Sequence, residues 1–197
     1  MSLPEIAIAA ALASGAGLRA YLVIFSVGLA GALGWIELPG YLQVLERPIV
    51  LAASGFMTCV EFFADKLPWL DSVWDAVHSF IRIPAGAALA AAVFGDSDAA
   101  VTIAAAILGG TLAATMHAAK SGARAAVNVS PEPFSNWALS LSEDALVPLG
   151  LWLAVAHPIV SFVLLVVLLV AAVFLVRLLW RLIASTLWSS RSTRSAP

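Results

Sequence analysis

The sequence predicts an all-α membrane protein with about six transmembrane helices. The 197-residue chain is 62% hydrophobic, and only 11% of its residues are Asp, Glu, Lys or Arg, against roughly 25% in soluble proteins. Its mean hydropathy is +1.00. Several apolar runs reach the length of about 20 residues that a helix needs to cross the hydrocarbon of a bilayer. We expect one transmembrane domain at 1–190 and a basic tail at 191–197.

Six helical segments follow from the apolar runs and from the Pro, Gly and polar turns between them. The first, 4–33, is interrupted by Ser14-Gly15-Ala16-Gly17. The loop at 34–48 carries Trp35 and Tyr41 as expected interface anchors. The third is expected to kink near Pro84, and the last contains 18 residues without a charge, 159–176. The second to fifth segments are 49–66, 71–94, 99–128 and 134–156, and the sixth begins at 158.

Basic residues fix the expected orientation. Four arginines follow the last apolar run, together with Trp180 and Trp188, and the positive-inside rule places such an end in the cytoplasm. Six spans would then put the N-terminus on the same side. We expect a multi-pass protein of the bacterial cytoplasmic membrane, and the net charge of −2 argues against nucleic acid as a partner. The four arginines are Arg177, Arg181, Arg191 and Arg194.

Polar residues recur at helical spacing within the apolar runs. Residues at i, i+4, i+7 and i+11 share one helix face, so each of these sets forms a stripe. Aligned stripes on several helices indicate a shared polar interior. The sets are Glu61 and Asp65; Asp71, Asp75, His78 and Arg82; His117, Ser121, Arg124 and Asn128, beside Lys120; and Asn136, Ser140 and Glu143, beside Asp144.

Not every charge in these stripes needs a function. Asp71 and Asp75 can cap the first turn of a helix, and long basic side chains can extend to the headgroups. Carboxylates deep in an apolar run are harder to place in this way, because their stems are short. We therefore expect Glu61, Glu143 and Asp144 to bind a ligand or to form ion pairs, and Arg19 to pair with one of them. A lone helical histidine is more often hydrogen-bonded than a metal ligand.

The two halves of the chain resemble each other. Gly17-Leu18-Arg19-Ala20 aligns with Gly122-Ala123-Arg124-Ala125 at an offset of 105 residues. A loop with Pro and then a helix with a deep carboxylate follow each copy. Three spans in each half would invert the second copy relative to the first, which is a recurrent transporter design with the site between the repeats. We therefore predict a 3+3 inverted repeat, 4–94 and 99–188, with broken or kinked helices.

Two blocks of sequence also resemble the bacterial membrane proteins grouped as domain-of-unknown-function family 4126. The resemblance spans most of the chain. It implies a small multi-spanning bacterial membrane protein, and it implies no activity. The blocks are Gly17-Leu18-Arg19-Ala20-Tyr21 and Phe63-Ala64-Asp65-Lys66-x-Pro68-x-x-Asp71-x-x-Trp74-Asp75-x-x-His78-x-Phe80-Ile81-Arg82-x-Pro84-x-Gly86.

The leading functional hypothesis is a transporter or channel for an ion or small polar solute, with proton coupling through buried carboxylates as an option. Grouped carboxylate oxygens make a divalent cation one possible substrate, with Glu61, Asp65, Glu143 and Asp144 as candidate ligands; an anion drawn by the basic residues is the opposite possibility. No other cofactor is predicted. The candidate pathway residues are Arg19, Glu61, Asp65, Asp75, His78, Arg82, His117, Arg124, Glu143 and Asp144.

Two other functions compete with transport. In an accessory membrane subunit, the stripes would be internal ion pairs that fix the helix register. A membrane enzyme ranks last, because the sequence has no His-Glu-x-x-His and no Gly-x-Ser-x-Gly motif. Surfaces of small residues, such as Gly109-Gly110, allow helices to approach closely, so we expect a homodimer or other homo-oligomer in the bilayer.

Overall fold

The computed structural model describes residues 2–67, 70–127 and 133–192, except for the side chains of residues 71, 72, 133, 179 and 182–192. The described residues are helical and contain no strand, so the all-α prediction is confirmed. A short 3-10 helix, η1, lies in the predicted loop. The elements are α1 (Leu3–Ala32), η1 (Gly40–Glu46), α2 (Pro48–Ala64), α3 (Leu70–Val93), α4 (Ala99–Val127), α5 (Pro133–Ala156) and α6 (Pro158–Ser192).

Five of the described helices are long and apolar enough to cross a membrane, and they are α1, α3, α4, α5 and α6. Helix α2 has 17 residues and reaches spanning length only together with η1, from which it is bent by 67°. Pro84 and Pro148 lie inside α3 and α5 without ending them. The protein is therefore a multi-pass membrane protein in a lipid bilayer, as its composition predicts.

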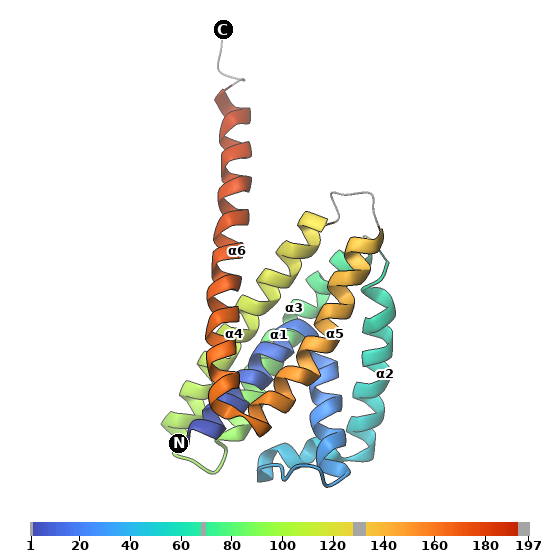
Figure 1. Ribbon diagram of the computed structural model, residues 1–197, viewed down its shortest axis with the longest axis vertical. Helices are drawn as coiled ribbons and strands as arrows, with labels where there is room; N and C mark the ends of the chain where they lie inside the picture. Colours follow the sequence, from blue (N-terminus) through green and yellow to red (C-terminus); the bar gives the residue numbers. More distant parts are fainter. Residues whose placement is uncertain (1, 68–69, 128–132, 193–197) are drawn as a thin grey trace.

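Helix α1 is broken at Arg19 and folds back on itself. Arg19 has φ −149° and ψ 76°, outside the helical region, whereas the residues on either side are helical. Gly15 and Val23 would stand about 12 Å apart along a straight helix. A Cβ on Gly15 would instead lie 2.8 Å from Val23 Cγ2. Figure 1 shows α1 rising from the N-terminus to the middle of the bundle and returning to the end where it began.

This hairpin corrects two predictions. The interruption lies at Arg19, two residues beyond the predicted Ser14–Gly17 stretch, because Arg19 is held by side chains of other helices. The first and last residues of α1 also lie at the same end of the bundle. The five α-helices that follow, α2 to α6, then run alternately from one end of the bundle to the other. The start of α1 and the end of α6 therefore lie at opposite ends of the bundle (Figure 1), whereas the six-span prediction put both ends of the chain on one side.

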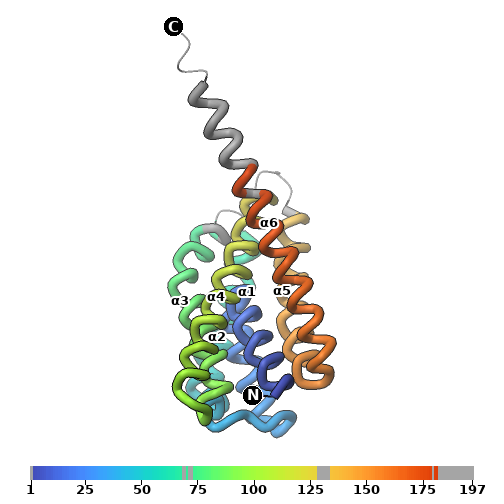
Figure 2. Tube along the Cα trace, turned by 90° about the vertical axis from the view of Figure 1, so that its left-hand side faces the viewer, coloured from blue at the N-terminus to red at the C-terminus, as the bar shows by residue number. Residues whose placement is uncertain are grey.

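The α1 hairpin forms the centre of the bundle. It contacts every other helix, with α3 and α4 on one side and α5 and α6 on the other (Figure 2). Its buried residues are mainly small, so neighbouring backbones approach closely. A Cβ on Gly17 would collide with the backbone of Ala113 in α4, and one on Gly86 would collide with the Ala113 side chain. Close packing of α1 against α4 therefore requires glycine at 17.

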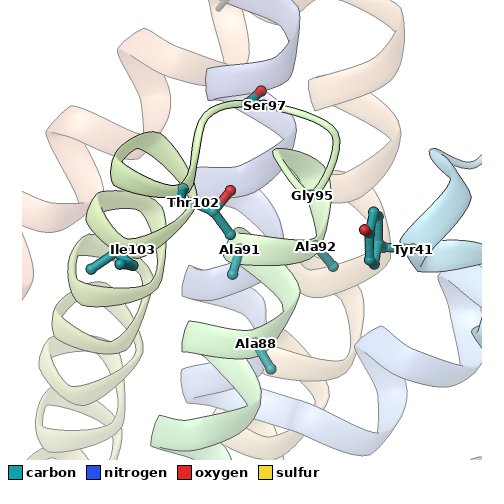
Figure 3. Close-up of a pocket in the computed structure, with 9 residues that line it drawn as sticks. Tyr41, Ala88, Ala91, Ala92, Gly95, Ser97, Thr102 and Ile103 are labelled. Atoms are coloured by element: carbon teal, nitrogen blue, oxygen red, sulfur yellow. The ribbon is translucent and has the colours of Figure 1, made fainter.

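The predicted interface anchors lie on the surface at the N-terminal end of the bundle. Trp35 is 74% exposed and Tyr41 is 60% exposed. Tyr41 extends from η1 toward Ala92 and Gly95 at the end of α3, beside an open, mostly apolar hollow of about 520 Å³ (Figure 3). A Cβ on Gly95 would overlap the Tyr41 ring. This contact ties η1 to the α3–α4 turn.

Substitution of Gly17 tests the packing of α1 on α4. We expect Gly17→Ala to lower the free energy of unfolding by about 1–3 kcal/mol, the usual cost of overpacking. Gly150→Ala is the matched control, because Gly150 is also helical and a Cβ there meets nothing within 4 Å. The control should be neutral or more stable, since alanine favours helix. Equal denaturation midpoints of both variants in detergent would contradict the packing argument.

Candidate functional site

Ten charged side chains meet inside the bundle, in the half where α2 and α4 end and α3 and α5 begin. Five are basic and five acidic, and we call them the charge network. They come from the break in α1, the C-terminal end of α2, the N-terminal half of α3, the C-terminal turns of α4 and the first half of α5. The members are Arg19, Lys66, Arg82, Lys120 and Arg124, with Glu61, Asp65, Asp75, Glu143 and Asp144.

The network is almost completely removed from solvent. Eight members are at most 4% exposed, and only Lys66 and Asp144 are partly exposed, at 18% and 22% of their side chains. A charge without a partner in such a site would be very unfavourable. The burial therefore requires the side chains to neutralise one another, as the stripes predict.

Asp65 is the centre of the network. It caps the C-terminal end of α2, and its Oδ2 accepts from Arg19 at 2.8 Å, Arg124 at 3.1 Å and Lys120 at 3.2 Å. Its backbone carbonyl, freed by the end of the helix, accepts from Arg124 Nη1 at 3.0 Å and from Asn136 Nδ2 at 3.3 Å. One residue thus joins α1, α2, α4 and α5.

Glu143 and Asp144 of α5 continue the network. Glu143 Oε2 accepts from Lys120 and Arg124, each at 3.1 Å, and lies 3.8 Å from Arg19 Nε. Asp144 Oδ1 lies 3.1 Å from Arg19 Nε, and its Oδ2 lies 4.0 Å from Lys66 Nζ. The prediction that Arg19 pairs with one of the deep carboxylates is confirmed, because it contacts both Glu143 and Asp144, in addition to Asp65.

Arg82 of α3 holds a second group of carboxylates. Its Nη2 donates to Glu61 Oε1 at 2.5 Å and its Nη1 donates to Asp75 Oδ1 at 2.6 Å. Asp75 also lies 3.7 Å from Lys120 Nζ and 3.7 Å from Arg124 Nε, which joins this group to the Asp65 centre. Glu61 has Arg82 as its one ion-pair partner among the described residues, whereas Asp65 and Asp75 each have three.

The network also stabilises the break in α1. A helix break leaves backbone carbonyls without their partners. Lys120 Nζ donates to the carbonyl of Leu18 at 2.9 Å. Arg19 Nη2 donates to the carbonyl of Ser140 at 3.2 Å and to its Oγ at 2.9 Å. The tip of the hairpin is thus fixed by α4 and α5 and not by local sequence.

His117 and His78 have different surroundings. Arg82 Nη1 lies 3.3 Å from His117 Nδ1. A guanidinium can only donate, so Nδ1 is the acceptor and Nε2–H donates to Ser79 Oγ at 2.6 Å. Ser79 in turn donates to the carbonyl of Asp75 at 3.0 Å. His78 Nδ1 donates to the carbonyl of Trp74 at 2.8 Å, and the two rings stack with centroids 4.0 Å apart.

Four carboxylate oxygens in the network are buried and accept no hydrogen bond from a described residue. They belong to side chains that bind cations through their other oxygen. Within the described ranges, no three His, Cys, Asp or Glu residues are grouped so that they could hold a metal ion, so the divalent-cation prediction gains no support. The four atoms are Glu61 Oε2, Asp65 Oδ1, Asp75 Oδ2 and Asp144 Oδ2.

Eight of the ten predicted pathway residues lie in the charge network, and His117 contacts it through Arg82. His78 instead packs against Trp74 and Tyr21. Asn128, the Asp71 side chain and the end of the basic tail at 193–197 lie outside the described residues.

The sequence prediction left Lys66, Lys120 and Ser79 out of the site. Lys120 lies four residues before Arg124 and three after His117, so helical spacing could have included it. Ser79 lies four residues after Asp75 and three before Arg82, so the same spacing could have included it, whereas its bond to His117 on another helix could not be predicted from spacing.

Removal of the central carboxylate should destabilise the fold. We expect Asp65→Asn to lower the free energy of unfolding by about 3–5 kcal/mol, because three buried cations lose their shared partner. Glu37→Gln is the control, since Glu37 is exposed, and we expect a change within about 0.5 kcal/mol.

The combined variant tests the coupling. In denaturant titrations, Asp65→Asn and Arg19→Gln together should cost less than the sum of the single changes. If the two changes in the free energy of unfolding simply add, the Arg19–Asp65 pair, whose atoms lie 2.8 Å apart, has no coupling energy.

Comparison with known proteins gives one match. The family model described as a domain of unknown function, DUF4126, matches residues 6–178. No curated protein and no solved structure matches the chain. The match covers both sequence blocks that suggest the family and every member of the charge network. The chain therefore belongs to the domain-of-unknown-function 4126 family.

Proposed function

We propose that this protein is a small membrane transporter or channel for an ion or small polar solute, and that the charge network is its site. The observation that carries the proposal is the convergence of ten charged side chains on the tip of a broken central helix. Broken helices whose ends meet charged groups inside the membrane are a recurrent feature of transporter sites. Intramembrane ionisable residues mark ion or substrate pathways more often than they mark packing.

Energetic reasoning supports a functional role for the network. Helices in a bilayer can associate through small residues alone, and α1 already has Gly17 against α4. Buried ion pairs can often be replaced by apolar residues without loss of stability. Stability alone therefore does not account for a network with eight buried charges. The four buried carboxylate oxygens without hydrogen bonds leave acceptor capacity for a proton or a passing solute.

The α1 hairpin is the proposed moving part. The charge network occupies one half of the bundle, and the Ala-rich legs of the hairpin fill the other. Passage of a solute requires the hairpin to shift relative to α3 and α4. The predicted inversion of the second half is not part of this proposal, because α1 and α4 both begin at the same end of the bundle (Figure 1). The two aligned arginines, Arg19 and Arg124, nevertheless contact the same oxygens of Asp65 and Glu143, although α4 stays helical through Arg124 while α1 breaks at Arg19.

The alternative is an accessory subunit with a static network. Two observations favour it. Each carboxylate in the network forms an ion pair with at least one basic side chain. The two hollows, one lined by Tyr41 and the other by Gly110, lie on the outside of the bundle and are not lined by the network. In either case we propose a homo-oligomer in the bacterial cytoplasmic membrane with its C-terminus in the cytoplasm.

Flux into proteoliposomes tests transport directly. The panel covers monovalent cations, divalent cations, anions and protons. We expect flux of at least one class by the unchanged protein and by Glu37→Gln, and a loss of about tenfold or more in Glu143→Gln, because a carboxylate at the site is neutralised. Asp144→Asn, in which a partly exposed carboxylate changes, is a second variant if Glu143→Gln does not fold. Flux that is equal in all folded proteins would remove the network from the pathway.

Water access to the network separates a transporter from a static subunit. Ser140 is fully buried beside Arg19, and Ser140→Cys in a Cys59→Ser background gives one small, centrally placed thiol. A transporter that opens should allow a membrane-impermeant thiol reagent to modify it within minutes to hours. Folded protein that stays unmodified, while the same thiol reacts after denaturation, would favour the accessory subunit.

A further inference from the structure

A groove on the outside of the bundle has the form of a lipid site. It lies between α4 and α6, touches α3 at Ile83, and has a volume of about 710 Å³. Small-molecule sites in proteins have volumes of about 300–1,000 Å³. The groove shares no lining residue with the charge network and is not part of the proposed transport site.

Small residues at every fourth position of α4 create the groove. Such residues share one helix face, and their missing side chains leave a channel beside α6. Thr111 and Thr115 also line it, but each hydroxyl donates to the carbonyl four residues earlier, at 2.8 Å. The wall therefore offers hydrocarbon almost throughout. The four small residues are Ala106, Gly110, Ala114 and Ala118.

Among the described residues, Arg177 is the one charged residue that lines the groove. It directly follows the uncharged stretch at 159–176 of α6, so it marks the depth at which the apolar part of that helix ends. Its side chain is exposed and has no ion pair with a described residue. Trp180, which is 74% exposed, lies one turn further along. An arginine followed by a tryptophan is typical of the headgroup region of a bilayer.

We propose that this groove binds one anionic phospholipid, with an acyl chain along the small-residue face of α4 and its phosphate on Arg177. The apolar wall fits hydrocarbon, and the guanidinium supplies the complementary charge, with donors arranged to hold a phosphate through two hydrogen bonds. A second copy of the chain is the competing occupant of such a face. The groove favours a lipid, because a concave surface with a cation at its end matches a chain with an anionic head. The proposal is independent of transport.

Native mass spectrometry of the full chain in detergent tests the site. Phosphatidylglycerol and phosphatidylcholine with identical acyl chains compete for the protein. We expect one site that prefers phosphatidylglycerol about fivefold, the ratio that corresponds to about 1 kcal/mol for one basic residue near an anionic surface. Arg177→Gln should bring the preference to parity. Arg181→Gln is the matched control, since Arg181 is the next basic residue of α6 and does not line the groove, and it should keep the preference.

A variant that fills the groove tests the acyl-chain part. Ala114→Leu should reduce bound lipid of both kinds severalfold while the helical circular-dichroism signal is unchanged. Ala118→Leu, at an exposed position, serves the same purpose if Ala114→Leu does not fold. A preference for phosphatidylglycerol that survives Arg177→Gln would overturn the proposal. So would an unchanged lipid count in the filled variant, or a lipid-free dimer that the filled variant abolishes, which would assign the groove to a second copy.

Discussion

Charge that cannot reach water must be neutralised within the bundle, and the rest of this structure depends on that constraint. Asp65 Oδ2 meets it most fully, because Arg19, Lys120 and Arg124 all donate to one atom. These contacts determine which faces of α1, α4 and α5 point inward. The Ala- and Gly-rich surfaces then allow the helices to approach closely enough for the side chains to meet. The ion pairs thus set the register of the helices, and the small residues allow the short distances between helix backbones that these pairs need.

The break in α1 and the charge network require each other. Arg19 can direct its guanidinium to both α2 and α5 because it stands at the tip of a hairpin, where no further helix continues above it. In turn, the carbonyl of Leu18, which the break deprives of its helical partner, is satisfied by Lys120. A continuous α1 would bury Arg19 on one face only and would leave Asp65 with fewer donors. The unfavourable backbone conformation is therefore offset by the pairs it makes possible.

Sequence periodicity predicted the helices and the inward stripes because both follow from a 3.6-residue period, and Asp75, Arg82, Arg124 and Glu143 lie where the stripes indicate. The α1 hairpin could not be predicted in this way. Its 30 residues have the length and hydropathy of a span, and the conformation of Arg19 is set by contacts with distant helices. The placement of the start of α1 and the end of α6 at opposite ends of the bundle follows from that single turn. The link from His117 to Ser79 was likewise inaccessible, because it joins residues on two helices.

Shared partners distinguish this network from a set of isolated ion pairs. Lys120 and Arg124 each contact both Asp65 and Glu143, and Arg19 contacts both of these carboxylates as well. When one such contact breaks, both charges keep another partner, so neither is left unpaired in the membrane. The charges of an isolated buried pair have no second partner, so separating them costs several kcal/mol. A network with exchangeable partners can thus follow a moving hairpin, which a static scaffold would not need.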